Sequence, residues 1–466
     1  APKTTIRPSD RRRTGVGRQK FGCINLVISF IWIPYIYATT FNRSKMKLLT
    51  CFVCAFFILS MSPLLSQTNY DESKVPSFEV PDPLTTFKGK KIKSVKKWEK
   101  ARRPELLHFF ENNVYGKIPK TLKIDSYNIL EQDDNALNGK AKRKQVELTF
   151  KNNGKTLSYT ILLYLPKNIA KAAVFLGYNF YGNHTITEDK AVLISSAWAN
   201  NNESFQIENN TLTEESRGKR TNRWAVEKIL EAGYGLATIY YGEVDPDKND
   251  FSDGIHSLLY QQDQSRPKLD EWGSIAAWSW GMVRALDYFE KDPDVDASKV
   301  ISFGHSRLGK TSLWAGATDK RFAGVISNNS GCGGATMSKR KFGETLAVIN
   351  DRFPHWFCDK FNEYNENEEA LPVDQHQLLA LIAPRPLYVA SAEEDQWADP
   401  RGEFLSAHYA TQVYHLYDME GIETMEMPKV NEPIHNTVSY HIRTGKHDVT
   451  DYDWENYIKW ANTFVK

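Results

Sequence analysis

The chain has 466 residues, of which 41% are hydrophobic and 25% charged, and its formal net charge is +2. This composition is typical of a globular protein with enough length for a large core. A near-neutral charge gives no reason to expect a polyanion as partner, so no nucleic-acid partner is predicted.

The N-terminal region has the form of an export signal preceded by extra sequence. Met46 and Lys47 are followed by an apolar run over residues 48–65 and then by Ser66, a small residue suited to cleavage. We interpret residues 46–67 as a Sec signal peptide and residues 1–45 as a non-native upstream extension. The apolar stretch 23–41 leaves a membrane-spanning helix open as the alternative. The mature chain is expected to be secreted or periplasmic, without a stable membrane anchor.

Residues 68–83 are polar and contain prolines, so we interpret them as a linker, and residues 84–466 as a single domain. Helical periodicity over residues 95–114 predicts a helix, and alternating apolar residues over 145–165 predict paired strands. The apolar runs 172–176 and 235–240 suit buried parallel strands. Between them, the polar residues 200–220 predict a surface loop.

The later part of the chain alternates between strand and helix patterns. We expect helices over residues 272–289, 309–316 and 454–465, and strands over 300–303, 324–328 and 386–390. This alternation predicts an α/β fold, a three-layer αβα sandwich with a mostly parallel central sheet. In such sheets, catalytic residues gather at the carboxyl ends of the strands.

Cys332 and Cys358 are the two cysteines outside the predicted signal and extension. An even pair in an exported protein is compatible with one disulfide, and two buried free thiols are the equal alternative.

Residues 304–311 follow a predicted strand, open a predicted helix and satisfy two motifs. Read as Gly, four residues, Gly-Lys-Thr, they match a phosphate-binding loop. With Ser306 on a tight strand-to-helix turn, they resemble a nucleophile elbow of an α/β-hydrolase, although Gly309 comes one residue late. The elbow is favoured, because an exported protein meets little nucleotide. The segment also comes late in the chain, and no apolar run ending in a magnesium-binding Asp follows it.

A serine nucleophile needs a base, and the base needs an orienting acid. In α/β-hydrolases these follow the serine in the order acid, then histidine. Glu393, Glu394 and Asp395 come soon after the predicted strand 386–390, and His447 precedes the last helix. His441 and His435 are rivals for the base on position alone.

The chain resembles the glucuronoyl esterases, carbohydrate esterase family 15, and specifically their bacterial branch. The resemblance runs from residue 81 to the C-terminus. The segments that carry it, besides residues 304–311, are Arg102-Arg103-Pro104-Glu105, Gly182-Asn183-His184-Thr185, Arg223-Trp224, Tyr240-Tyr241-Gly242-Glu243, Ser330-Gly331-Cys332-Gly333-Gly334, Leu371-Pro372-Val373-Asp374-Gln375-His376 and Trp397-Ala398-Asp399-Pro400.

The resemblance implies a role for each matched residue. The nucleophile falls on Ser306, the base on His447, and an arginine that stabilises the oxyanion on Arg307. Sugar-binding residues fall on Lys310, Glu344 and Trp397, with Glu344 the least certain match. No metal or organic cofactor is implied.

One position departs from the family pattern. Many members carry the triad acid as Glu directly before the Ser-Gly of the Ser330 segment, where this chain has Asn329. An amide cannot orient an imidazolium by charge. The acid is therefore assigned to Asp395, with Glu394 in reserve.

The resemblance implies hydrolysis of the ester between 4-O-methyl-glucuronic acid on glucuronoxylan and a lignin alcohol, by way of an acyl-enzyme. A monomer is expected. The alternatives are an acetyl xylan esterase or other carbohydrate esterase, a non-catalytic carbohydrate-binding protein, and a nucleotidase using the phosphate-loop pattern.

Overall fold

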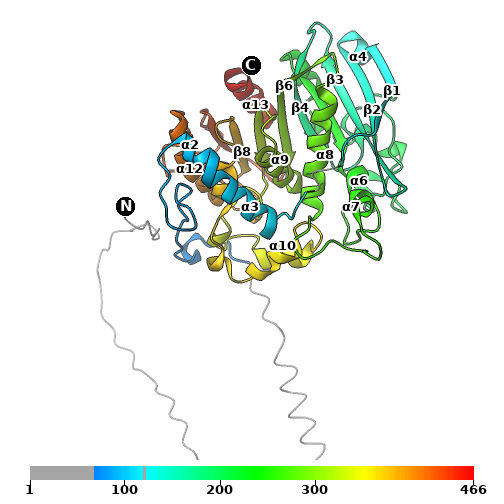
Figure 1. Cartoon of the computed structure of the whole chain (residues 1–466). Coiled ribbons are helices and arrows are strands. Elements are labelled where there is room, and N and C mark those ends of the chain that lie inside the picture. Colours follow the sequence, from blue (N-terminus) through cyan, green and yellow to red (C-terminus); the bar gives the residue numbers. More distant parts are fainter. Residues whose placement is uncertain (1–67, 119–121, 466) are drawn as a thin grey trace, which may run out of the picture. The chain divides into compact units, whose positions relative to one another are not determined.

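The computed structural model describes residues 68–118 and 122–465. The signal peptide and the upstream extension predicted from the sequence lie outside the described residues. The described part is built on a nine-stranded sheet in the order β1-β2-β3-β5-β4-β6-β7-β8-β9 (Figure 1). Its strands are β1 (Ser126–Asn135), β2 (Ala141–Asn152), β3 (Lys155–Pro166), β4 (Ala172–Asn179), β5 (Gly235–Tyr240), β6 (Val295–His305), β7 (Gly324–Asn328), β8 (Leu387–Ala392) and β9 (Val438–Arg443).

The sheet has an antiparallel end and a longer parallel part. Strands β1, β2 and β3 pair antiparallel, and β3 also runs antiparallel to β5. From β5 through β4, β6, β7 and β8 to β9, all neighbours are parallel. The carboxyl ends of these six strands therefore meet at one edge of the sheet, which is where an α/β protein places its chemistry.

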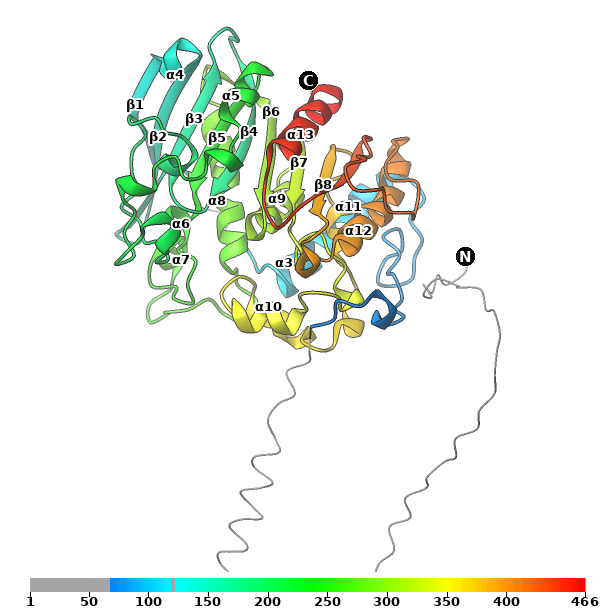
Figure 2. The same ribbon diagram turned by 180° about the vertical axis from the view of Figure 1, so that it is seen from behind.

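Alternate residues of the central strands face opposite sides of the sheet, and each side has its own core. In β8, Leu387 and Val389 belong to one hydrophobic cluster, whereas Tyr388 and Ala390 belong to the other. This is the period-two alternation of a strand that is covered on both faces. Helices α3, α8 and α9 lie on one face, and α5 and α13 on the opposite face (Figures 1 and 2).

These layers confirm the α/β-hydrolase fold predicted from the sequence. The helices are α2 (Val95–Lys97), a π-helix (Trp98–Arg102), α3 (Arg103–Asn113), α4 (Ala136–Gly139), α5 (Val226–Glu231), α6 (Tyr241–Val244), α7 (Gly254–Leu259), α8 (Ser274–Phe289), α9 (Arg307–Thr318), α10 (Leu346–Arg352), α11 (Gln375–Ala380), α12 (Pro400–Tyr414) and α13 (Asp451–Phe464). The short 3-10 helices are Glu72–Lys74, Asn183–Ile186, Glu203–Phe205, Glu214–Ser216, Thr221–Arg223, Ser338–Arg340, Asp359–Tyr364, Glu368–Ala370, Gln396–Ala398 and His415–Tyr417.

The helix expected over residues 95–114 is present as one helical stretch interrupted by the π-turn, and the predicted strand pair 145–165 is the β2–β3 hairpin. Two parts of the chain behave differently from the simplest reading of the sequence. Residues 69–83 lie against the domain, with Phe78 buried and the Pro81 carbonyl accepting a hydrogen bond from His376. The polar stretch 200–220 buries Phe205 and Ile207.

Cys332 and Cys358 are both buried and unpaired, so free thiols rather than a disulfide occupy these positions. In residues 68–118 and 122–465, no helix combines the length and the apolar character needed to cross a membrane.

Candidate active site

Ser306 stands on the turn between β6 and α9, at the carboxyl edge of the sheet. Its backbone has φ 60° and ψ −131°, a region that non-glycine residues rarely occupy and that costs of order 1–3 kcal/mol. The turn is possible because Gly304 has no side chain: a Cβ there would lie 1.8 Å from the carbonyl oxygen of Leu308. The backbone N–H of Ser306 donates to the Asn328 carbonyl at the end of β7, at 2.9 Å.

The late glycine of this motif also has a steric reason. A Cβ on Gly309 would lie 2.9 Å from the Cβ of Ser330. Helix α9 can therefore pack closely on the loop after β7 only with glycine at this position. The strand–turn–helix context and the strained serine are those of a nucleophile elbow.

The residues that suggested a phosphate-binding loop are engaged elsewhere. Lys310 is buried, and its ammonium donates to the carbonyl of Ser330. The hydroxyl of Thr311 donates to the Arg307 carbonyl at 3.1 Å. The Thr311 hydroxyl is therefore occupied within helix α9 and is not free to bind a magnesium ion, so the structure favours the elbow over the phosphate loop.

His447 and Asp395 lie together as the sequence predicts. Nδ1 of His447 donates to Oδ2 of Asp395 at 2.6 Å, and the amide of Asn329 donates to the same oxygen at 2.8 Å. Burial would raise the pKa of Asp395, but the hydrogen bond and charge of His447, helped by Asn329, hold that pKa below its ordinary value. A carboxylate on Nδ1 leaves Nε2 of the imidazole free to accept a proton.

The other candidates for acid and base are placed differently. Glu394 is exposed. His441 is fully buried between Tyr388 and Asp453, and His435 contacts Asn456. None of the three approaches the His447–Asp395 pair through a hydrogen bond or ion pair within the part of the chain that the structure describes.

The imidazole of His447 lies beside the elbow. Its ring centroid is 4.4 Å from that of His305, the residue that directly precedes Ser306. Among the described residues, no hydrogen bond joins the Ser306 hydroxyl to the imidazole. The structure thus brings His447 and Asp395 into contact and places His447 next to the serine turn. In unliganded hydrolases this last hydrogen bond commonly tightens only when substrate binds.

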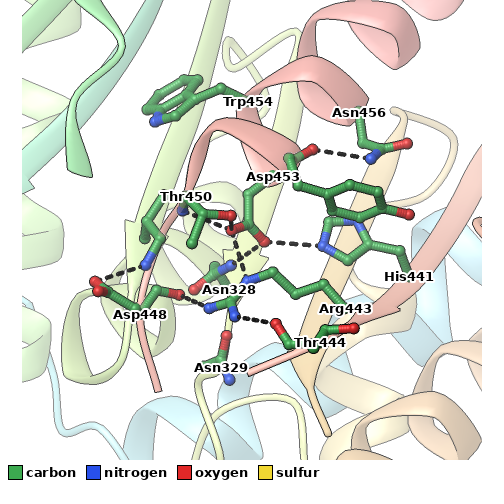
Figure 3. A network of polar contacts seen from close by, with 12 residues as sticks. Asn328, Asn329, His441, Arg443, Thr444, Asp448, Thr450, Asp453, Trp454 and Asn456 are labelled. Atoms are coloured by element: carbon green, nitrogen blue, oxygen red, sulfur yellow. Dashed lines mark hydrogen bonds and ion pairs between the residues drawn. The ribbon is translucent and has the colours of Figure 1, made fainter. Parts of the chain in front are cut away.

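A buried polar network holds the loop that carries His447 (Figure 3). Asp453, in the first turn of α13, accepts from Nε of Arg443 at 2.8 Å and from Nε2 of His441 at 2.9 Å. Arg443 in turn donates to the main-chain carbonyls of Lys446 and Asp448, which flank His447. The loop that carries His447 is therefore attached to β9 and α13 through one guanidinium.

The same network reaches β6, the strand that ends at the serine turn. The side-chain amide nitrogen of Asn328 donates to Asp453 at 3.1 Å, and its side-chain oxygen Oδ1 accepts from Nδ1 of His305 at 2.6 Å. His305, to which the sequence assigns no chemistry, is thus part of the support that joins the serine turn to the loop that carries His447.

Arg307 and Lys310 bring two cations to the site. The Arg307 guanidinium pairs with Asp247 and lies 4.6 Å from the ring centroid of Trp356. The Lys310 ammonium lies 5.9 Å from the same ring. Burial lowers the pKa of Lys310, while the charge of Glu344 opposes that fall.

Glu344 and Trp397 are neighbours. The backbone N–H of Glu344 donates to the Trp397 carbonyl at 3.0 Å, and the Arg352 guanidinium lies 5.3 Å from the Trp397 ring centroid. Burial raises the pKa of Glu344, against the opposing charges of Lys310 and Arg352. The three predicted sugar-binding residues are therefore linked, Lys310 to Glu344 by charge and Glu344 to Trp397 through the main chain.

Two buried acidic side chains at this edge escape sequence reasoning. Asp247 faces Arg307, and Glu403 accepts from the backbone N–H groups of Ser330 and Gly331 at 2.7 and 3.0 Å. Asp399-Pro400 is a sequence pattern typical of a helix start and marks the beginning of α12. Nothing in the sequence, however, indicates that the Glu403 side chain reaches back to the loop after β7.

A family model described as glucuronyl esterase of fungi matches residues 225–418. Carbohydrate esterase MZ0003, from an unknown prokaryotic organism, is 48% identical over 399 residues, covering 84% of this chain and 91% of that protein. A solved structure of a promiscuous CE15 esterase from a marine bacterial metagenome superposes with a TM-score of 0.81 at 48% identity, covering 85% of this chain and all of that one. The glucuronoyl esterase from Solibacter usitatus gives a TM-score of 0.79 at 47% identity, over 84% of this chain and 99% of that one.

Proposed function

Because the chain belongs to the glucuronoyl esterases of carbohydrate esterase family 15, and is thus a carboxylic ester hydrolase, we propose that Ser306, His447 and Asp395 are its catalytic triad. The substrate we propose is the ester that joins 4-O-methyl-glucuronic acid on glucuronoxylan to a lignin alcohol. The observation that carries the proposal is the 2.6 Å contact between His447 and Asp395 beside the strained serine turn.

In the proposed reaction, the Ser306 hydroxyl attacks the ester carbonyl while Nε2 of His447 takes its proton. The C–O bond to the alcohol then breaks, His447 gives that proton to the departing alcohol oxygen, and the glucuronoyl group stays on Ser306. Water attacks this acyl-enzyme by the same route, releasing the free uronic acid. Asp395 holds the imidazole tautomer and stabilises its positive form in both halves.

The oxyanion of each tetrahedral intermediate needs donors that are already in place. The N–H of Arg307 is the first of helix α9, so it has no carbonyl partner within the helix. The helix N-terminus favours negative charge at this point. We assign the second donor to the Arg307 guanidinium.

Recognition of the uronate is assigned to Lys310, Glu344 and Trp397. An ammonium and a buried carboxyl group complement sugar hydroxyls, which both donate and accept hydrogen bonds. The indole of Trp397 offers an apolar face for the sugar ring. We also propose that the chain is exported by means of residues 46–67, since the proposed polymeric substrate lies outside cells. We propose further that the mature chain acts as a monomer.

The test is hydrolysis of benzyl glucuronate by the mature chain, with acetylated xylan assayed in parallel. Ser306→Ala should lower kcat/KM by several orders of magnitude, whereas Ser298→Ala, at the distant start of β6, should leave it unchanged. Cleavage of acetylated xylan alone would leave the assignment of Ser306 as nucleophile intact but would refute the proposed glucuronate substrate. Inertness on both would favour a carbohydrate-binding protein.

A further inference from the structure

Asp247 is a buried carboxylate outside the proposed triad that accepts hydrogen bonds from four side chains. Arg307 and the Tyr241 hydroxyl, at 3.0 Å, donate to its Oδ2. His355 Nε2 and Trp356 Nε1 each donate to its Oδ1 at 2.8 Å. Only 7% of Asp247 is exposed, so few waters compete for it. Four donors from three separate segments of the chain fix this carboxylate in one orientation.

The guanidinium that Asp247 contacts is enclosed by aromatic rings. Its central carbon lies 4.6 Å from the Trp356 ring centroid, 5.5 Å from that of Phe353 and 5.7 Å from that of Phe180. Nε of Arg307 is buried and has no hydrogen-bond partner among the described residues. Asp247 thus holds one nitrogen of the Arg307 guanidinium, and the aromatic rings fix the plane of that group. The other N–H groups of the guanidinium remain available to a ligand.

Asp247 also sets the charge of this part of the site. Burial would raise the pKa of Asp247, but Arg307, His355 and Trp356 outweigh burial and hold that pKa far below its ordinary value. The charged form of Asp247 is therefore favoured, and in the ion pair it offsets the positive charge of Arg307. Without it, Arg307 would be an uncompensated cation in a site that already contains Lys310.

The charge matters because the substrate and the product of ester hydrolysis differ. The ester is neutral at the reacting carbon, the tetrahedral intermediate carries a transient negative oxygen, and the product is a permanent carboxylate. A free guanidinium binds carboxylates tightly through charge-assisted, bidentate hydrogen bonds. A guanidinium that is already paired with one carboxylate has fewer free donors and less net charge with which to bind a second carboxylate.

We propose that Asp247 is a positioning residue for the reaction: it orients Arg307 toward the oxyanion and limits how strongly Arg307 retains the uronate product. This inference rests on the proposed function, because it takes Arg307 as an oxyanion donor and a uronate as the product.

The experiment compares Asp247→Asn with Asp250→Asn, an exposed carboxylate of the same segment that pairs with Lys248. With benzyl glucuronate, Asp247→Asn should lower kcat by about 10²-fold, as expected for a misplaced oxyanion donor. The inhibition constant for free glucuronate should fall by about tenfold, because Arg307 gains a charge-assisted partner. Asp250→Asn should match the wild type in both constants.

A double-mutant cycle separates positioning from general damage. If Asp247 acts through Arg307, adding Asp247→Asn to Arg307→Ala should cost little further activity. An equal loss in both backgrounds, or an unchanged inhibition constant in Asp247→Asn, overturns the inference. If Asp247→Asn does not fold, Tyr241→Phe loosens the carboxylate without changing its charge. It should lower kcat several-fold and leave the inhibition constant alone, and an unchanged kcat overturns the inference.

The two proposals fail in different ways. A wild-type chain that does not cleave glucuronate esters refutes the proposed function. A wild type that cleaves them, with Asp247→Asn indistinguishable from Asp250→Asn, refutes only the role of Asp247.

Discussion

Replacing Arg443 with methionine tests whether the buried network holds the base. Methionine keeps most of the side-chain length but removes every donor. Asp453 loses the Nε contact of 2.8 Å, and the carbonyls of Lys446 and Asp448 lose theirs. Breaking a buried ion pair costs about 3–5 kcal/mol. Asp453 retains donors from His441, Asn328 and Thr450, so we expect the lower end, about 3 kcal/mol.

That free energy converts into a measurable shift of the melting temperature. At about 2.1 cal/mol/K per residue, a domain of about 400 residues has an unfolding entropy of about 0.8 kcal/mol/K. Arg443→Met should therefore melt about 4 °C below the wild type. Because the loop that carries His447 is no longer attached to Arg443, kcat/KM at 25 °C should fall by about 10- to 100-fold.

The assay combines thermal unfolding by circular dichroism with hydrolysis of benzyl glucuronate well below the melting temperature. The control is Arg401→Met, which breaks a half-exposed ion pair with Glu72 and should cost at most about 1 kcal/mol. If Arg443→Met melts lower but keeps its kcat/KM within about twofold, the base does not depend on this guanidinium. An unchanged melting temperature would refute the energetic reasoning itself.

Three further predictions concern the acid, a buried glutamate and the serine turn. Asp395→Asn should lower kcat by several orders of magnitude, as loss of the acid does in other triads. Glu394→Gln, at an exposed position, should have a kcat near that of the wild type. The reverse result would assign the acid to Glu394 instead. Burial raises the pKa of Glu403 from its ordinary 4.5 to about 8, so the folded state binds an extra proton between these values. The contribution of Glu403 to stability should thus be complete below about pH 4.5 and be lost as the pH rises through 8. The melting temperature of the wild type should therefore fall between pH 5 and 8.5, and Glu403→Gln should show a smaller fall over the same range. Gly304→Ala places a Cβ 1.8 Å from the Leu308 carbonyl, so it should displace the turn and lower kcat/KM by at least about 10²-fold, and full activity would show that the turn does not need glycine.

The part of the fold predicted from the sequence is the part with local patterns. Strands β4 to β8 are apolar runs bounded by polar residues, and the helices between them have clear periodicity. Strand β1 was not predicted because it is an edge strand whose residues, such as Tyr127 and Ile129, are largely exposed. Strand β9 was not predicted because it buries His441 and Arg443, polar residues that are stable there only through Asp453.

The same distinction applies to the site. Ser306 was predictable because its turn, its glycines and the following helix are contiguous in sequence. Asp247 meets His355 across 108 residues, and Glu403 meets Ser330 across 73. Contacts at such separations leave no periodic signal in one sequence, so both carboxylates became apparent only in three dimensions.

The position proposed for the acid has a consequence for how enzymes of this kind are compared. Strands β7 and β8 are neighbours, and Asn329 at the end of one lies 2.8 Å from Asp395 after the end of the other. A single imidazole is thus within reach of side chains from both strands. In the proposed triad, a carboxylate at either strand end would serve the same imidazole, so two point substitutions would exchange its position while Ser306 and His447 keep theirs. A comparison made position by position would class such a chain as lacking the acid, although a carboxylate lies 2.6 Å from Nδ1 of His447.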